Sequence, residues 1–312
     1  MNTIGPLAGL ALVFGFFALL APPGFSSQSN IETIFRQTAI VGAAALGMTV
    51  IIISGGIDLS VGSIIALSTV IIAALLAAGQ SPFVAALGGV SGGLAAGFVT
   101  GNIIARLKVI PFIVTLGALL VIRGIAKGLA GEQKIDAPAS WLSSLLAALP
   151  PDRQWMLFPP GVWLTIFLAV LMAMILKYTR FGRYVFAIGS NEQAATLSGL
   201  PIRRLKITAY ALAGAFAGVA GLLQFSRLTV GDPTVAMGLE LDVIAAVVIG
   251  GGSLAGGEGS IFGSLIGALI MTVIRSGCTQ MGLPNWVQEI VTGSIIVIAV
   301  ALDRLRHRGR AR

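Results

Sequence analysis

The feature that most constrains this chain is a series of apolar runs, each close to the length of a helix that crosses a membrane. We predict ten such runs, at residues 4–21, 37–54, 60–79, 82–106, 110–130, 160–178, 207–226, 238–252, 259–276 and 286–303. A helix needs about 20 mainly apolar residues to cross the hydrocarbon core of a bilayer. Charged residues are only 10% of the chain, whereas a soluble domain carries about 25%. We therefore predict an all-α, polytopic integral membrane protein in which residues 1–312 form a single transmembrane domain.

The distribution of lysine and arginine predicts the orientation of the chain. Residues 179–206 carry five basic residues against one acid, and the tail after residue 303 is rich in arginine. Because basic loops stay on the cytoplasmic side, we expect residues 179–206 and both termini to be cytoplasmic and residues 131–159 to form the largest external loop. The first run lacks a basic start and a cleavage site, which predicts a retained span. The net charge of +8 then reflects topology and anionic membrane lipid, not nucleic acid.

Two glycine-rich segments interrupt the apolar pattern. The first glycine break, residues 54–63, reads SGGIDLSVGS, and the second glycine break, residues 250–260, reads GGGSLAGGEGS. Similar flanks suggest an internal repeat, and glycine-interrupted spans in corresponding places are typical of a transport pathway. An acid near hydrocarbon suggests function, although Asp58 could equally cap the helix that follows it. The predicted pathway consists of the breaks and nearby polar groups: Gly55, Gly56, Asp58, Thr115, Glu240, Asp242, Gly251 and Gly252.

The sequence GSNEQAATLSGLP, residues 189–201, predicts a helix of about eight residues inside the basic segment. Ser190 or Asn191 can cap its first turn, Glu192 suits the positive end of the helix dipole, and Gly199 followed by Pro201 ends the helix. One interpretation is a connector on the membrane surface. The other is a docking helix that sits in a groove of a cytosolic partner, with Glu192 paired to a basic residue of that partner. The candidate docking residues are Asn191, Glu192, Ala194, Ala195, Leu197 and Gly199.

Motifs of catalysis and cofactor binding are absent from the sequence. It contains no G-x-x-x-x-G-K-[ST] phosphate loop, no H-E-x-x-H zinc motif and no G-x-S-x-G nucleophile elbow. A single cysteine, Cys278, excludes an internal disulfide and argues against cysteine-bound zinc and iron–sulfur clusters. The only histidine, His307, lies in the basic tail. We therefore predict no catalytic residue, no metal site and no cofactor.

Three polar residues in the run at 110–130 have simple structural interpretations. Arg123 and Lys127 lie one turn apart on a helix face, and we expect both to extend toward the membrane interface. Thr115 lies deeper in the run, where we expect its hydroxyl to bond the helix backbone.

Five motifs in a fixed order resemble one family over essentially the whole chain. They are GGIDLSVGS (55–63), PFIVTLG with the following RG (111–117 and 123–124), GSNEQAATLSGLPIRRLK (189–206), ELDVIAAVVIGGGSLAGGEGSIFGSLIGALI (240–270) and the closing AVALDRLRHR. The chain resembles the permease subunits of bacterial monosaccharide ABC importers of the ribose type. The resemblance implies a multi-pass permease of the bacterial inner membrane, paired with a second copy or a paralogue. It also implies a cytosolic ATP-binding subunit, a periplasmic sugar-binding protein, and a coupling helix at residues 191–199 that contacts the ATPase.

The chain departs from that family at three positions. Gly252 stands where the family commonly has Thr, Thr196 where it has a basic residue, and Leu200 where it has Ile. These departures leave open which ATPase and which solute belong to this chain. The alternatives within the class are autoinducer-2, nucleosides and branched-chain amino acids. Two alternatives lie outside the class of ABC permeases. One is an ion-coupled secondary carrier, which predicts ionisable residues at mid-membrane, and the other is an intramembrane enzyme.

The external loop at residues 131–159 is the expected docking surface for the binding protein. It is the largest outward segment, and charged rims of an interface govern association rate and salt dependence. The predicted docking residues are Glu132, Asp136, Asp152 and Arg153.

Overall fold

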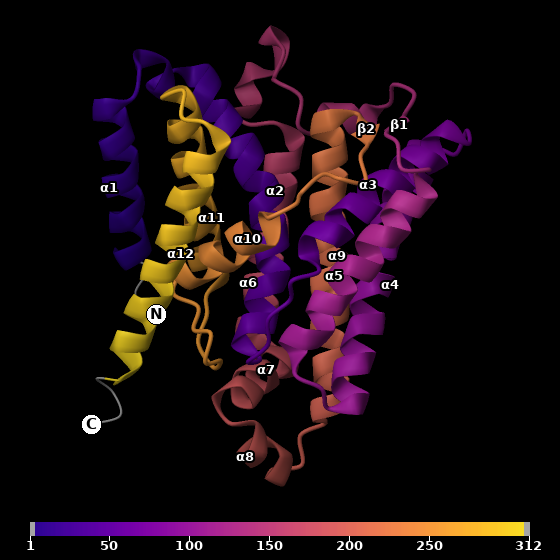
Figure 1. Ribbon diagram of the computed structural model, residues 1–312, viewed down its shortest axis with the longest axis vertical. Coiled ribbons are helices and arrows are strands. Elements are labelled where there is room, and N and C mark those ends of the chain that lie inside the picture. Colours follow the sequence, from indigo (N-terminus) through magenta and orange to yellow (C-terminus); the bar gives the residue numbers. More distant parts are fainter. Residues whose placement is uncertain (1–3, 309–312) are drawn as a thin grey trace.

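The computed structural model describes residues 4–308 and shows a bundle of helices (Figure 1). Arg310 and Arg312 of the basic tail lie outside the described residues. The α-helices are α1 (Ile4–Leu20), α2 (Gln28–Ile53), α3 (Val61–Ala77), α4 (Pro82–Leu107), α5 (Pro111–Leu129), α6 (Pro160–Tyr178), α7 (Arg180–Ser190), α8 (Glu192–Leu197), α9 (Ile202–Leu228), α10 (Leu239–Ile249), α11 (Ile261–Gln280) and α12 (Asn285–Arg308). Short 3-10 helices are η1 (Pro23–Ser26), η2 (Trp141–Leu145) and η3 (Pro151–Met156). Two strands, β1 (Ile135–Asp136) and β2 (Val230–Gly231), pair antiparallel.

Every predicted apolar run coincides with one of these helices. Within the part of the chain that the structure describes, six helices are long and apolar enough to cross a membrane: α2, α4, α5, α6, α9 and α11. The number of spans, predicted as ten, stays a prediction. The largest difference is at α2, which begins at Gln28 and not near residue 37. Ser27 caps this helix by accepting a hydrogen bond from the amide of Asn30, so the polar residues 28–36 are helical although they are not part of an apolar run.

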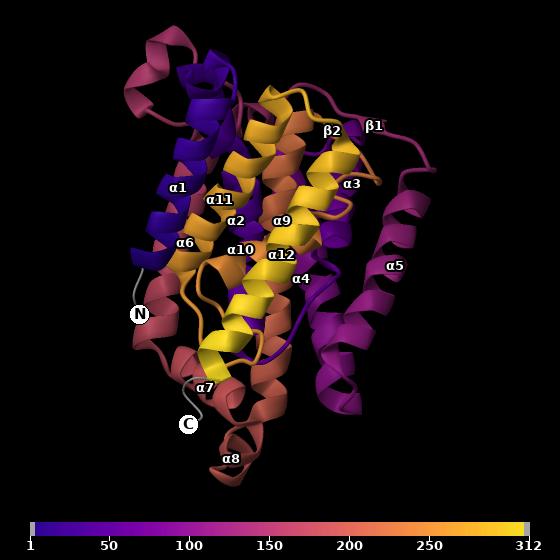
Figure 2. The same ribbon diagram turned by 60° about the vertical axis from the view of Figure 1, so that its left-hand side comes forward.

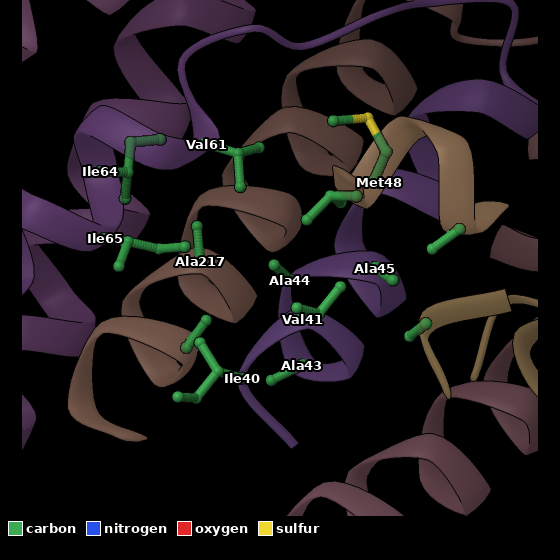
Figure 3. Close-up of a cluster of buried hydrophobic side chains, with 14 of the residues drawn as sticks. Ile40, Val41, Ala43, Ala44, Ala45, Met48, Val61, Ile64, Ile65 and Ala217 are labelled. Carbon is green, nitrogen blue, oxygen red and sulfur yellow. The ribbon is translucent and has the colours of Figure 1, made fainter. Parts of the chain in front are cut away.

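The core of the bundle is built on α2 and α9. Figure 3 shows Ile40, Val41 and Met48 of α2 packed with Ile64 of α3 and Ala217 of α9. Burial of such side chains is worth about 25 cal/mol per Å² against water, but inside a bilayer close packing matters more. The core is therefore dense because alanine and glycine let the helix backbones approach.

The contact between α4 and α9 depends on glycine. A Cβ atom at Gly97 would overlap the carbonyl oxygen of Tyr210 and lie 3.0 Å from the Cα of Gly214. A Cβ atom at Gly93 would lie 2.9 Å from the amide nitrogen of Gly218. This is the small-residue packing that brings membrane helices together, and it explains the glycines spaced four apart in both helices.

The two ends of the bundle carry different features (Figure 1). One end, here called the α8 end, carries α7 and α8, and the end of α12 points toward it. The opposite end, called the β end, carries β1, β2 and residues 131–159 with η2 and η3. The predicted placement of both termini on the same side as residues 179–206 stays a prediction. Which side faces the cytoplasm stays a prediction.

Helices α5 and α12 lie on the outside of the bundle. Figure 2 shows α5 at its edge and α12 passing across α10. Only Thr115, Ile122 and Ala126 of α5 are buried, and large apolar side chains such as Leu120 and Val121 are exposed. Exposed apolar surface of this kind suits contact with lipid or with another membrane helix.

Candidate translocation pathway and coupling helix

A cavity of about 990 Å³, lined mainly by polar side chains, lies among the helix ends of the β end. Its walls come from the start of α2, the end of α9, the start of α10, the end of α11 and the first half of α12. The lining combines hydroxyl, amide and charged side chains, among them Asn30, Gln37, Arg227, Asp242, Arg275 and Gln288. Polar groups are costly inside a membrane and are placed there for function. The cavity is therefore the strongest candidate for a solute pathway in this chain.

The polar space continues toward the middle of the bundle. A smaller cavity of about 40 Å³ shares Gln37, Arg227, Asp242 and Arg275 with the large cavity. Its other walls include Val41 and Met271, about one helical turn further from the β end along α2 and α11. The polar space thus narrows from the large cavity to a constriction near Asp242.

Two hydrogen-bonded groups organise the lining. Nη2 of Arg275 donates to Oδ2 of Asp242 at 2.5 Å, and the carboxylate is buried while the guanidinium is half exposed. Oδ1 of Asn30 accepts from Oγ of Ser276 at 3.0 Å and from Nε2 of Gln280 at 3.2 Å. These contacts join α10 to α11 and α2 to α11, so donors and acceptors are held at fixed positions. Such a surface can hydrogen-bond the hydroxyl groups of a polyol.

The cavity contains one of the predicted pathway residues. Asp242 lines it, whereas Glu240, in the same turn of α10, accepts from the amide of Gly238 at 3.3 Å. The remaining predicted residues, Gly55, Gly56, Asp58, Thr115, Gly251 and Gly252, do not line either cavity. Their role in transport stays a prediction.

Asp58 of the first glycine break is fully buried. Its Oδ1 accepts from the amide of Ser60 at 2.8 Å and from Oγ of Ser60 at 2.6 Å. Helix α3 begins at Val61 with Ser60 as its N-cap residue, so Asp58 forms a turn before the helix and does not cap it. The capping interpretation is therefore wrong. Its Oδ2 has no hydrogen-bond partner among the residues that the structure describes.

The same break is held from two sides through the carbonyl of Ile57. The hydroxyl of Tyr210 in α9 donates to it at 3.3 Å, and the hydroxyl of Thr115 in α5 approaches it at 3.4 Å. Thr115 also bonds the carbonyl of Phe112 at 3.2 Å, which confirms its expected contact with the helix backbone. The break is thus fixed by two neighbouring helices.

Arg123 points into the protein and not only toward the membrane interface. Its Nη1 donates to the carbonyls of Pro233 at 2.9 Å and Val235 at 2.7 Å. These carbonyls belong to the connector between α9 and α10, which leads into the cavity wall at Met237. Arg123 thus holds backbone that lies 110 residues away in sequence, and its position at the membrane interface stays a prediction.

The same connector carries an ion pair. Lys134 Nζ lies 3.2 Å from Oδ2 of Asp232, and Thr234 donates to Oδ1 of Asp232 from its amide and its hydroxyl at 2.8 and 2.7 Å. Burial opposes ionisation of this carboxyl, but the bonds from Thr234 and the ammonium of Lys134 lower the pKa of Asp232 below its ordinary value. The connector is therefore fastened to the segment that carries β1.

Helix α8 is capped as the sequence predicts, with Asn191 and not Ser190 as the cap. Oδ1 of Asn191 accepts from the amide of Ala194 at 2.9 Å, whereas Ser190 is the last residue of α7. Gly199 has φ of +76°, the left-handed conformation that ends helices. The helix is six residues long and not about eight, because a separate helix, α7, ends directly before Asn191.

One docking detail predicted for α8 is wrong. Ala195 is buried against Ile188 and Leu205 of the same chain, so it cannot enter a groove of a partner. Glu192 pairs with Lys206 at 2.7 Å while half of its side chain stays exposed, so its contact with a partner stays a prediction. Leu197 is 90% exposed, and Ala194 is exposed beside it. The outward face of α8 is therefore built on Leu197.

The predicted docking residues for a binding protein all lie at the β end. Glu132, Asp136, Asp152 and Arg153 are exposed, and Asp152 pairs with Arg153 at 3.8 Å. Trp155 and Leu157, 79% and 71% exposed, add apolar surface nearby in the chain. Docking at this end stays a prediction.

Sequence reasoning missed most of the cavity lining. Asn30, Thr33 and Gln37 follow the three- and four-residue spacing of one helix face. For a helix that begins at Gln28, this spacing predicts a polar face. Arg227 and Arg275 are single charges at the ends of apolar runs, where interfacial positions are common. No local signal brings these residues together.

The fold defines a multi-pass membrane protein, and the polar cavity among its helices is of the kind that a transporter would use. Residues 30–300 match the family described as "Branched-chain amino acid transport system / permease component", and the chain belongs to this family. Its relatives include a ribose import permease of Bacillus subtilis, 39% identical over 97% of this chain and 93% of the relative. An L-arabinose ABC transporter permease of Azospirillum brasilense is 35% identical over 97% and 89%. A D-allose transport system permease of Escherichia coli is 34% identical over 95% and 90%. No solved structure matches the chain.

Proposed function

We propose that this chain is the membrane permease subunit of an ABC importer for a monosaccharide such as ribose. The observation that carries the proposal is the end-to-end match with permeases named for ribose, L-arabinose and D-allose. The cavity supports it, since hydroxyl and amide groups with one oriented ion pair suit a neutral polyol. A branched-chain amino acid would favour an apolar recess beside separated charges. Residues 1–312 act as one permease domain.

The partners follow from the two ends of the bundle. A cytosolic ATP-binding subunit docks at the α8 end, because the chain has no phosphate loop of its own and its basic residues cluster there. A periplasmic sugar-binding protein docks at the β end. A second permease copy or a paralogue completes the pore, and the complex lies in the bacterial inner membrane. The chain itself is not an enzyme, and ATP hydrolysis belongs to its partner.

Reconstitution tests this function directly. The chain and an ATP-binding subunit are placed in proteoliposomes, with ATP on the side of the α8 end and a sugar-binding protein on the side of the β end. Uptake of labelled ribose, L-arabinose, D-allose and leucine is then measured. ATP-dependent uptake of a sugar, abolished without the ATP-binding subunit, is expected. Uptake driven by a proton or sodium gradient without ATP would instead establish a secondary carrier, and uptake of leucine alone would establish an amino-acid permease.

A further inference from the structure

The end of α7 packs backbone to backbone against both glycine breaks. A Cβ atom at Gly189 would overlap the carbonyl oxygen of Ile53 and lie 2.5 Å from the amide nitrogen of Gly257. That amide donates to the same carbonyl of Ile53 at 2.8 Å. Three segments far apart in sequence thus meet at one point, here called the glycine junction: Ile53 before the first break, Gly189 in α7, and Gly257 in the second break.

The glycine junction leaves no room for independent movement of its members. At Gly256 an added Cβ would lie 2.6 Å from the carbonyl oxygen of Gly189 and 3.0 Å from the Cα of Gly55, and at Gly257 one would lie 3.0 Å from the Cα of Ser190. Both glycines have positive φ, +88° and +76°, which glycine adopts at least cost. Closely packed protein interiors transmit displacement because they contain few voids and are hardly compressible. A shift of α7 must therefore move the second break or separate the junction.

On one side the junction is joined rigidly to α8. Asn191 is the only residue between α7 and α8, and its amide donates to the carbonyl of Ala187 at 3.1 Å. Ala195 of α8 packs on Ile188 of α7. The ion pair between Glu192 and Lys206 fixes α8 to the start of α9. Helices α7 and α8 consequently form one corner that moves as a unit.

On the other side the junction leads to the cavity. The second break follows α10 directly, and α10 is packed against α11 so closely that a Cβ at Gly267 would lie 2.7 Å from the carbonyl carbon of Ala246. The opposite end of this eleven-residue helix carries Leu241 and Asp242, which line the cavity. Displacement of the second break therefore reaches the constriction through one short, stiff helix.

We propose that Gly189 is a positioning residue that transmits movement of α8 through the glycine junction to α10, and so to the cavity. The inference rests on the proposed docking of an ATP-binding subunit at α8. Switching transitions in proteins proceed by rigid elements moving about a few packed contacts. At the glycine junction these contacts run from backbone to backbone, with no flexible side chain between them. Glycine is required at position 189 because any side chain would open the junction.

The test compares Gly189→Ala with Gly117→Ala in the reconstituted complex. Gly117 lies in α5, where an added Cβ meets no heavy atom within 4 Å, so it controls for a glycine-to-alanine change in a helix. Gly189→Ala should retain the ATP-binding subunit on co-purification and keep its basal ATP hydrolysis. Sugar uptake per ATP hydrolysed should fall about tenfold, in the range of typical coupling energies between sites. Gly117→Ala should match the wild type in all three measurements.

A second measurement needs no variant. Hydrogen exchange of the wild-type complex, with and without a non-hydrolysable ATP analogue, should change at residues 187–199 and at residues 250–260 together. Should Gly189→Ala prevent assembly, this measurement decides: a change at 187–199 without any change at 250–260 overturns the inference. Wild-type uptake per ATP in Gly189→Ala overturns it as well. Failure of the proposed function is distinct, because the wild-type chain itself would then neither retain the ATP-binding subunit nor respond to ATP.

Discussion

Asp242 illustrates how a charged residue is accommodated inside a bundle of apolar helices. Its carboxylate is buried in the first turn of α10 and accepts from Arg275 of α11, which is half exposed toward the cavity. Burying a charge is expensive, and an opposite charge with good geometry offsets much of that cost. Negative charge in the first turn also suits the helix dipole. The residue thus fixes the start of α10 and presents a polar surface to the cavity.

Removing Arg275 tests how far the buried carboxylate of Asp242 depends on its ion pair. We expect Arg275→Met to destabilise the protein by about 1–3 kcal/mol, less than for a fully buried pair because Arg275 is half exposed. The double variant Asp242→Asn with Arg275→Met should recover part of the loss, since no uncompensated charge remains. Thermal unfolding midpoints in detergent measure both effects. If the losses of the single variants Asp242→Asn and Arg275→Met simply add in the double variant, the ion pair does not stabilise the contact between α10 and α11.

At the scale of elements, α8 shows how a six-residue helix can be stable. A helix this short does not form alone in water. It is stabilised here by the Asn191 cap, the Glu192–Lys206 pair and the burial of Ala195. Only its outer face, around Leu197, remains for contact with another protein. A substitution at Ala195 would therefore test the folding of α8 more than its docking.

Leu197→Arg is the cleaner test of docking at α8. We expect it to reduce co-purification of the ATP-binding subunit at least about tenfold, because a charge placed in an apolar contact is left desolvated and unpaired. Leu157→Arg is the matched control, since Leu157 is similarly exposed but lies at the β end. Membrane insertion of both variants should be normal. Undiminished retention of the ATP-binding subunit by Leu197→Arg would show that α8 is only a connector.

At the scale of the whole molecule, the two proposed docking surfaces lie at opposite ends of the bundle. The α8 end holds a small helix joined through the glycine junction to the interior. The β end holds the cavity, the connector clamped by Arg123 and Lys134, and the exposed charges of residues 131–159. Energy from one partner and solute from the other would thus enter at opposite ends and meet near α10.

Docking at the β end should depend on salt. We expect neutralisation of Glu132, Asp136, Asp152 and Arg153 together to slow association of the sugar-binding protein and to flatten its salt dependence, because rim charges act mainly on association rate. Surface plasmon resonance at several salt concentrations measures both. Neutralising Arg203 and Arg204 at the opposite end is the control and should leave docking unchanged. Equal association rates for the two variants would place the binding-protein site elsewhere.

The sequence by itself determined the helices and the local geometry at their ends. The ten apolar runs coincide with helices because hydropathy over about 20 residues is a property of each segment alone. The Asn191 cap and the left-handed Gly199 were likewise predictable, since each depends on hydrogen bonds and φ angles within a few residues. The short apolar helix α10, with two acids in its first turn, was also predictable from the sequence.

Only the tertiary structure decided which faces of those helices meet. Ala195 was predicted to face a partner and faces its own chain, whereas Leu197 faces outward. The cavity depends on contacts such as that between Asn30 and Ser276, which are 246 residues apart. The glycine junction likewise joins residues of α2, α7 and the second break. Such contacts depend on the relative placement of whole helices, and no local pattern of apolar and polar residues encodes that placement.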